Sequence, residues 1–138
     1  MGQGVPATVL IVEDDRSCSE LIAEVVQDLG FFARVHDRVE QTLALIRQER
    51  PALVILDVVL PDGDGVGVLR AIRGESDLSN VPVLLCTAAM FYSPDLRHPA
   101  ADPYTAVVAK PFHIDAFGRM VMQLARMPAS PILTPQQL

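Results

Sequence analysis

The chain has 138 residues, half of them hydrophobic and a fifth charged, a composition that indicates one globular domain and excludes a disordered chain. Its net charge of −6 argues against nucleic-acid binding, which needs clustered Lys and Arg. No apolar run approaches the roughly 18 residues that span a bilayer, and the first residues do not resemble a signal peptide. We therefore expect a cytoplasmic protein with no membrane contact, and interpret Cys18 and Cys86 as reduced thiols.

The first part of the chain alternates apolar runs with segments of helical periodicity. In chain order we predict a strand at Thr8–Val12, a helix over Leu21, Ile22, Val25, Val26 and Leu29 that ends at Gly30, a weaker strand at Ala33–His36, and a helix marked by Val39, Leu43 and Ile46 that ends before Pro51. Asp15 is predicted to be the N-cap of the first helix.

The same alternation continues in the second part. The predicted elements are a strand at Leu53–Leu56, a helix over Val66, Leu69 and Ile72, strands at Val83–Cys86 and Ala106–Ala109, and a helix over Ile114–Met127 with Phe117, Val121 and Leu124 on one side. Strands that are apolar throughout and separated by helices predict a parallel sheet covered on both faces, so the fold class is a three-layer α/β domain. We assign residues 1–127 to this domain.

One segment interrupts the pattern. Met90–Tyr104 should contain the helix between the fourth and fifth strands, but it includes Pro94, Pro99 and Pro103. A proline inside a helix costs about 3 kcal/mol, so we expect this fourth helix to be short or irregular. Residues 128–138 are predicted to be a proline-rich tail or the start of a linker.

Polar side chains follow four of the predicted strands where each strand ends. Glu13 and Asp14 come after the first strand, Asp57 after the third, Thr87 after the fourth and Lys110 after the fifth. Function in parallel α/β sheets gathers beyond the carboxyl ends of the strands, so we expect these groups to share one rim.

The electrostatics of such a rim require a cation. Two carboxylates about 4 Å apart repel by roughly 4 kcal/mol at an effective dielectric constant near 20. Lys110 supplies one positive charge, and oxygen ligands without nearby Cys or His favour Mg²⁺ over zinc. A carboxylate can also act as a nucleophile toward a phosphoryl group, whose charge the metal and a lysine would stabilise.

In order, VLIVEDD, LDVVLPDGDG, a Thr after an apolar strand, and KPF resemble the receiver domain of two-component response regulators over about residues 8–127. The resemblance implies a flavodoxin-like, five-stranded parallel sheet of order 2-1-3-4-5. It also implies Mg²⁺-dependent phosphoryl transfer from a histidine kinase or phosphotransfer protein, which switches the binding of a downstream protein. Such a domain is a signalling module that assists its own phosphorylation and dephosphorylation, and is not a turnover enzyme.

The resemblance also assigns roles to individual residues. Asp57 matches the phosphoacceptor, and Thr87 and Lys110 match the switch hydroxyl and the phosphate-binding lysine. The implied metal ligands are Glu13, Asp14, Asp57 and the backbone carbonyl of Val59. The family's Lys-Pro peptide bond is usually cis, which an X-Pro bond tolerates at about 1 kcal/mol.

The chain departs from the family pattern at several positions. Val107 occupies the place of the usual aromatic switch residue three positions before the lysine, and Tyr104 is six positions before it. This predicts that output does not use the usual Thr–aromatic coupling. Val59 and Ala89 occupy positions that, in the family, tune water access to the acyl phosphate, and two apolar residues there predict slow autodephosphorylation.

Other interpretations remain open from the sequence. A degenerate receiver could serve as a phosphorylation-independent interaction module, and a flavodoxin-like cofactor binder would share the fold. The acidic turn after the first strand argues against the cofactor binder, because it would repel an FMN phosphate. Asp62-Gly-Asp-Gly lacks the later ligands of an EF-hand, and His36, His98 and His113 are scattered. The kinase and the downstream partner are not predicted, and a homodimer is left open.

Overall fold

The computed structural model describes residues 6–88 and 102–126. In chain order the elements are β1 (Thr8–Val12), α1 (Arg16–Asp28), β2 (Phe32–His36), α2 (Thr42–Glu49), β3 (Leu53–Asp57), β4 (Val59–Leu60), β5 (Gly63–Asp64), α3 (Gly65–Gly74), β6 (Val83–Ala88), β7 (Thr105–Lys110) and α4 (Ile114–Ala125). All five predicted strands are present, with bounds that agree to within two residues.

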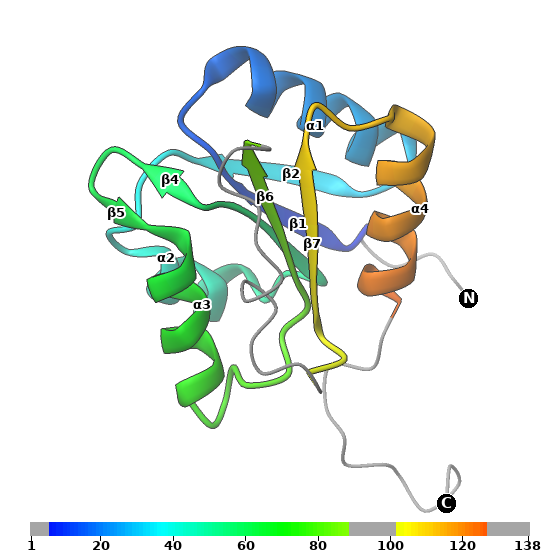
Figure 1. Cartoon of the computed structure of the whole chain (residues 1–138). Helices are drawn as coiled ribbons and strands as arrows, with labels where there is room; N and C mark the ends of the chain where they lie inside the picture. Colours follow the sequence, from blue (N-terminus) through cyan, green and yellow to red (C-terminus); the bar gives the residue numbers. More distant parts are fainter. Residues whose placement is uncertain (1–5, 89–101, 127–138) are drawn as a thin grey trace, which may run out of the picture.

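Five parallel strands form one sheet in the order β2-β1-β3-β6-β7, so the predicted 2-1-3-4-5 order is confirmed. Helices α1 and α4 cover one face of the sheet, and α2 and α3 cover the other (Figure 1). The inner strands β1 and β3 are buried almost throughout, as expected for a parallel sheet covered on both sides. The three-layer α/β fold class is therefore confirmed.

Each face of the sheet carries its own hydrophobic core. On one face, Ile22 of α1 packs in a cluster with Phe117 and Val121 of α4. On the other face, Ile46 of α2 shares a cluster with Ile72 of α3. The helical periodicity predicted these inward-facing residues. Leu21 differs, because it lies on the outer side of α1 and is 42% exposed.

The ends of α1 are those the sequence predicts. The carboxylate of Asp15 accepts a hydrogen bond from the Cys18 N–H at 3.0 Å, so Asp15 is the N-cap. At the other end Gly30 adopts φ +97°, a backbone conformation that favours glycine.

Helix α2 begins later than the sequence predicts. Val39 was expected to mark this helix, but the helix starts at Thr42 because Gln41 has φ 67°, in the left-handed region. The N–H groups of Val39 and Glu40 donate to the carboxylate of Asp62 at 2.7 and 3.0 Å. This long-range interaction holds the residues before Thr42 in a non-helical loop.

Two predicted segments lie largely or wholly outside the described residues: the irregular fourth helix within residues 90–104, and the tail at residues 128–138. Within residues 6–88 and 102–126, no helix is long and apolar enough to cross a membrane.

Gly65, the first residue of α3, lies directly against the end of β3. A Cβ atom placed on Gly65 would sit 2.1 Å from the backbone oxygen of Asp57. The Gly65 N–H also donates to the Val58 carbonyl at 2.7 Å. Only glycine permits this close approach, which fixes the backbone at Asp57 and Val58.

We predict that Gly65→Ala lowers the free energy of unfolding by roughly 3 kcal/mol, because the methyl group must displace backbone. Gly67→Ala is the matched control in the same helix: its Cβ would meet nothing within 4 Å. The control should raise stability by about 0.5–1 kcal/mol through helix propensity. Urea unfolding measures both, and equal effects of the two substitutions would contradict the packing argument.

Candidate metal and phosphoryl-acceptor site

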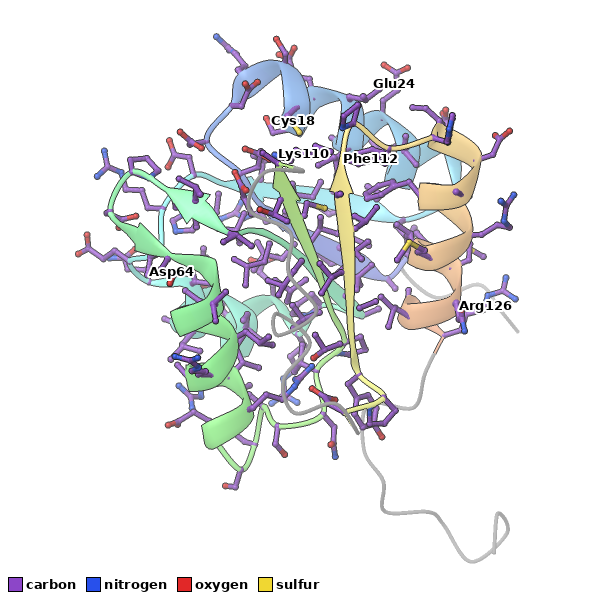
Figure 2. All side chains as sticks on the ribbon, in the orientation of Figure 1. Cys18, Glu24, Asp64, Lys110, Phe112 and Arg126 are labelled. Carbon is purple, nitrogen blue, oxygen red and sulfur yellow. The ribbon has the colours of Figure 1, made fainter. Side chains whose placement is uncertain are left out.

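The carboxyl ends of four neighbouring strands bring the predicted polar residues to one rim of the sheet. Val12 of β1 pairs with Leu56 of β3, so Glu13 and Asp57 follow at the same level. Thr87 lies in β6, next to β3, and Lys110 is the last residue of β7. Figure 2 shows Lys110 at this end of the sheet, near Cys18 of α1.

Lys110 forms the central ion pairs of the site. Its Nζ lies 2.6 Å from Oε1 of Glu13 and 3.6 Å from Oδ2 of Asp57. Glu13 is 3% exposed and Asp57 8% exposed, so both pairs are shielded from solvent. The side chains that the sequence placed on separate strands are thus in direct contact. The Lys110-Pro111 peptide bond is cis, as the resemblance implied.

Three carboxylates form an acidic cluster beside this ion pair. Glu13, Asp14 and Asp57 each offer an oxygen atom, and these atoms all lie within 4.8 Å of one another. Asp14 is exposed, so the cluster opens to solvent on its side. The surrounding pocket has a volume of about 380 Å³ and also includes Val59 and Lys110. A set of carboxylate oxygens at an open pocket fits Mg²⁺, which commonly retains water ligands.

Within the acidic cluster, the pKa of Asp57 is raised and the pKa of Glu13 is lowered. Burial, together with the neighbouring carboxylate of Glu13, raises the pKa of Asp57 to about 6. Burial is the largest single influence on Glu13 and acts to raise its pKa, but the hydrogen bonds with Lys110, Asp57 and the Asp15 N–H, together with the charge of Lys110, outweigh burial and lower that pKa. Glu13 is therefore the permanently ionised partner of Lys110, while Asp57 carries excess affinity for a proton or a metal cation.

The thiol of Cys18 is a poor competitor for a metal ion. Burial and the nearby carboxylate of Glu13 raise its pKa to about 11. The thiol therefore stays protonated at neutral pH, and the potential ligands at this rim are oxygen atoms.

Thr87, next to Ala88 of the pocket lining, has a side-chain hydroxyl without a partner. Its side chain is fully buried, and Oγ1 has no hydrogen-bond partner among the described residues. A buried hydroxyl without a partner costs roughly 1–3 kcal/mol, so its position favours a ligand atom that accepts a hydrogen bond from it. The resemblance implies such a ligand contact for Thr87, which matches the switch hydroxyl of the family.

A short antiparallel hairpin, β4 and β5, borders the pocket and was not predicted. Val59 of β4 pairs with Asp64 of β5, and the Val59 N–H donates to Oδ1 of Asp57 at 3.4 Å. The only signal in the sequence was the Asp-Gly-Asp-Gly turn. Asp62 at its tip accepts from the loop before α2, which anchors the hairpin.

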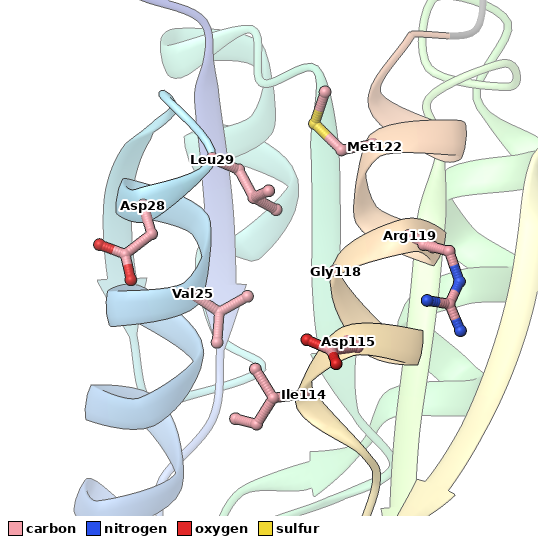
Figure 3. A pocket seen from close by; sticks show the side chains of 8 residues that line it. All are labelled: Val25, Asp28, Leu29, Ile114, Asp115, Gly118, Arg119 and Met122. Carbon is pink, nitrogen blue, oxygen red and sulfur yellow. The ribbon is translucent and has the colours of Figure 1, made fainter.

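A second cavity, of about 490 Å³, lies between α1 and α4. Val25 and Leu29 of α1 face Gly118 and Ile114 of α4 across it (Figure 3). Its floor is apolar, and its charged residues, Asp28, Asp115 and Arg119, belong to helix surfaces. Of these two pockets, only the acidic one brings together carboxylates and an ammonium group from several strands.

The fold and the site together define the class of protein. A doubly wound α/β sheet carries an acidic cluster at the end of its first and third strands, with a lysine from the last strand. This combination is typical of a phosphate-responsive signalling domain.

The chain belongs to the response regulator receiver domain family, whose model matches residues 9–121. It is similar to the crystal structure of a protein from Chloroflexus aurantiacus J-10-fl that is provisionally described as a response regulator. That match has a TM-score of 0.78 and 28% identity, and it covers 89% of this chain and all of the other. Receiver domains are signalling domains of two-component systems and are not classical enzymes, so these predictions are confirmed at the level of the family.

Curated relatives match only in part of their length. The probable transcriptional regulator ycf27 of Guillardia theta is 39% identical over 80 residues, 58% of this chain and 30% of that protein. The DNA-binding response regulator MtrA of Mycolicibacterium paratuberculosis is 38% identical over 80 residues, which is 58% of this chain and 34% of that protein. The matched region thus spans about a third of the length of these relatives.

The raised pKa of Asp57 generates a prediction on stability. Because the folded-state value of about 6 lies above the ordinary 3.8, the protonated carboxyl favours folding. That contribution is complete below about pH 4 and is lost as the pH rises through about 6. In metal-free buffer near pH 8, Asp57→Asn should therefore raise the free energy of unfolding, by about 1–3 kcal/mol. Urea titrations at several pH values measure the difference.

The increase in the free energy of unfolding caused by Asp57→Asn should shrink toward zero below about pH 4, where wild-type Asp57 is protonated. Added Mg²⁺ should stabilise the wild type more than the Asn variant, because the variant lacks one carboxylate. An Asn variant that is less stable than the wild type near pH 8 without metal would contradict the electrostatic account.

Proposed function

We propose that Asp57 accepts a phosphoryl group from a histidine kinase or a phosphotransfer protein, in a reaction that depends on Mg²⁺, and that this changes the binding of a downstream protein. One observation carries the proposal: Asp57 is the buried carboxylate of the acidic cluster whose pKa is raised and which Lys110 approaches within 3.6 Å. Receiver family membership supports it.

The side chains of the pocket suit this reaction. An oxygen of Asp57 bonds to phosphorus as the P–N bond of the donor phosphohistidine breaks, and the departing imidazole keeps the bonding electrons and takes a proton from water. Mg²⁺ held by Glu13, Asp14, Asp57 and the Val59 carbonyl would offset the charge on the phosphoryl oxygens. Lys110 and the unused hydroxyl of Thr87 would stabilise the same oxygens by ionic and hydrogen-bonding contacts.

The partners in this proposal are proteins. The net charge of −6 supports a domain that does not itself bind nucleic acid. MtrA is described as DNA-binding, but the match covers only 34% of that protein. We propose that the activity of this chain is cytoplasmic and that residues 1–127 form the receiver unit.

A small phosphodonor such as acetyl phosphate, with Mg²⁺, should add one phosphoryl group to the protein, and Asp57→Asn should abolish the addition. Intact-protein mass spectrometry measures it. Asp15→Asn is the matched control, because Asp15 lines the same pocket and Asn also caps helices. Labelling that survives Asp57→Asn would refute the acceptor assignment, and an unlabelled wild type would favour the interaction module.

The phosphorylated protein should lose its phosphoryl group slowly. Val59 lies at the pocket and is 53% exposed, so an apolar side chain stands where a polar one would orient an attacking water molecule. We expect Val59→Asn to shorten the lifetime of the phosphorylated form and Val59→Ile to leave it unchanged, as followed on phosphate-affinity gels. Decay of the wild type within seconds in Mg²⁺ would overturn this prediction.

A further inference from the structure

Arg73 makes a dense set of hydrogen bonds at the end of the sheet opposite the acidic pocket. It lies in the last turn of α3, and its side chain is 15% exposed. Its Nε donates to Oδ2 of Asp102 at 2.7 Å. Its two terminal nitrogens donate to four oxygens: those of Ser79 and Val81 before β6, the Tyr104 carbonyl, and Oγ1 of Thr105, the first residue of β7. These five bonds match the five N–H donors of a guanidinium group.

Asp102, which precedes β7 in the chain, belongs to the same hydrogen-bond network. Its carboxylate accepts hydrogen bonds from the Tyr104 N–H and from the hydroxyl of Thr105. The Tyr104 carbonyl also accepts from the N–H of Val83, the first residue of β6. We call Arg73, Asp102 and Thr105 the Arg73 clamp. The clamp ties the start of β7 to the start of β6 and to α3.

The side chains within β7 define its register weakly. Among residues 6–88 and 102–126, this strand lies at the edge of the sheet and pairs with β6 alone, from Val83 with Thr105 to Ala88 with Lys110. Between its ends the sequence is Ala-Val-Val-Ala, so after a slip of one residue one face again receives an Ala and a Val, and the other face receives a Val with either Thr105 or Lys110. Hydrophobic burial therefore opposes such a slip only slightly. The slip would nevertheless turn every side chain of β7 to the opposite face of the sheet.

The position of Lys110 depends on this register. Lys110 is five residues beyond Thr105, about 16 Å along the strand. Its ammonium group crosses the ends of β6 and β3 to reach Glu13 after β1. A one-residue slip would place Ala109 at that level, and a two-residue slip would displace the lysine by about 6–7 Å.

We infer that Arg73 is a positioning residue for Lys110: by fixing the register of β7 from the far end of the sheet, the Arg73 clamp places the ammonium group at the acceptor carboxylate. The inference rests on the proposed function, because positioning matters only if Lys110 assists phosphoryl transfer. The proposed metal ligands, which follow β1, end β3 and lie in the hairpin, make none of the clamp's hydrogen bonds, so loss of the clamp should impair transfer and spare metal binding.

The test compares Arg73→Gln and Arg73→Lys with Arg47→Gln. Arg47 is the matched control because its guanidinium also forms ion pairs, with Glu75 and Asp77, but within the described part of the chain makes no hydrogen bond to β7. We expect Arg73→Gln to slow labelling by acetyl phosphate by about tenfold or more, as loss of a charged group from the site would. Arg73→Lys should restore part of the rate, and Arg47→Gln should keep the wild-type rate. Calorimetry should show that no variant weakens Mg²⁺ binding.

A double-mutant cycle separates positioning from a merely structural role. In a Lys110→Ala background, Arg73→Gln should slow labelling no further, because the group it positions is gone. The inference would be overturned if the two substitutions slowed labelling independently, so that their fold-effects multiplied in the double variant. A wild-type labelling rate in Arg73→Gln would also overturn it. If Arg73→Gln does not fold, Thr105→Val, which replaces the hydroxyl with a methyl group of similar size, provides the same comparison.

The register itself is measured by NMR contacts between the backbones of β6 and β7. The wild type should show Cys86 beside Val108, and Arg73→Gln should lose that contact or show a second set of contacts between the two strands. This readout does not depend on phosphorylation. If the wild type is never labelled, the proposed function fails, while an unchanged register in Arg73→Gln defeats the inference on its own.

Discussion

Two buried carboxylates and one ammonium group share a pocket with too little positive charge to satisfy both acids, and the rest of the structure depends on this imbalance. Lys110 satisfies Glu13 at 2.6 Å and reaches Asp57 only at 3.6 Å. At an effective dielectric constant near 20, like charges about 4 Å apart repel by roughly 4 kcal/mol. Asp57 therefore retains an affinity for cations that the protein itself leaves unmet, and Asp14 opens this site to solvent.

The fold maintains this imbalance from several directions. Burial of β1 and β3 by both helix layers fixes Glu13 and Asp57 side by side, and the backbone contact at Gly65 holds the end of β3. The lysine comes from an edge strand, where side-chain packing gives little control of register. The Arg73 clamp supplies that control through hydrogen bonds, so the geometry of the pocket depends on residues at both ends of the sheet.

The sequence predicted those features that follow from local periodicity and strand polarity. Wholly apolar runs identified the strands, and parallel strands must place Glu13, Asp57 and Lys110 at one rim, where they are found in contact. Features set by contacts between distant residues were missed. Asp62 holds the residues before α2 in a loop, and Arg73 bonds to residues on both sides of β6 and at the start of β7. Neither interaction has a signature within a short window of sequence.

The most direct test of the central claim is a crystal structure determined with Mg²⁺ and beryllofluoride, which mimics an acyl phosphate. The account predicts a metal ion about 2.1 Å from carboxylate oxygens of Asp14 and Asp57, with beryllium bound to the other oxygen of Asp57. It also predicts that the ammonium group of Lys110 leaves Glu13 for a fluoride and that the Thr87 hydroxyl gains a partner. A structure in which Asp57 stays unmodified and Lys110 remains on Glu13 at saturating concentrations would contradict it.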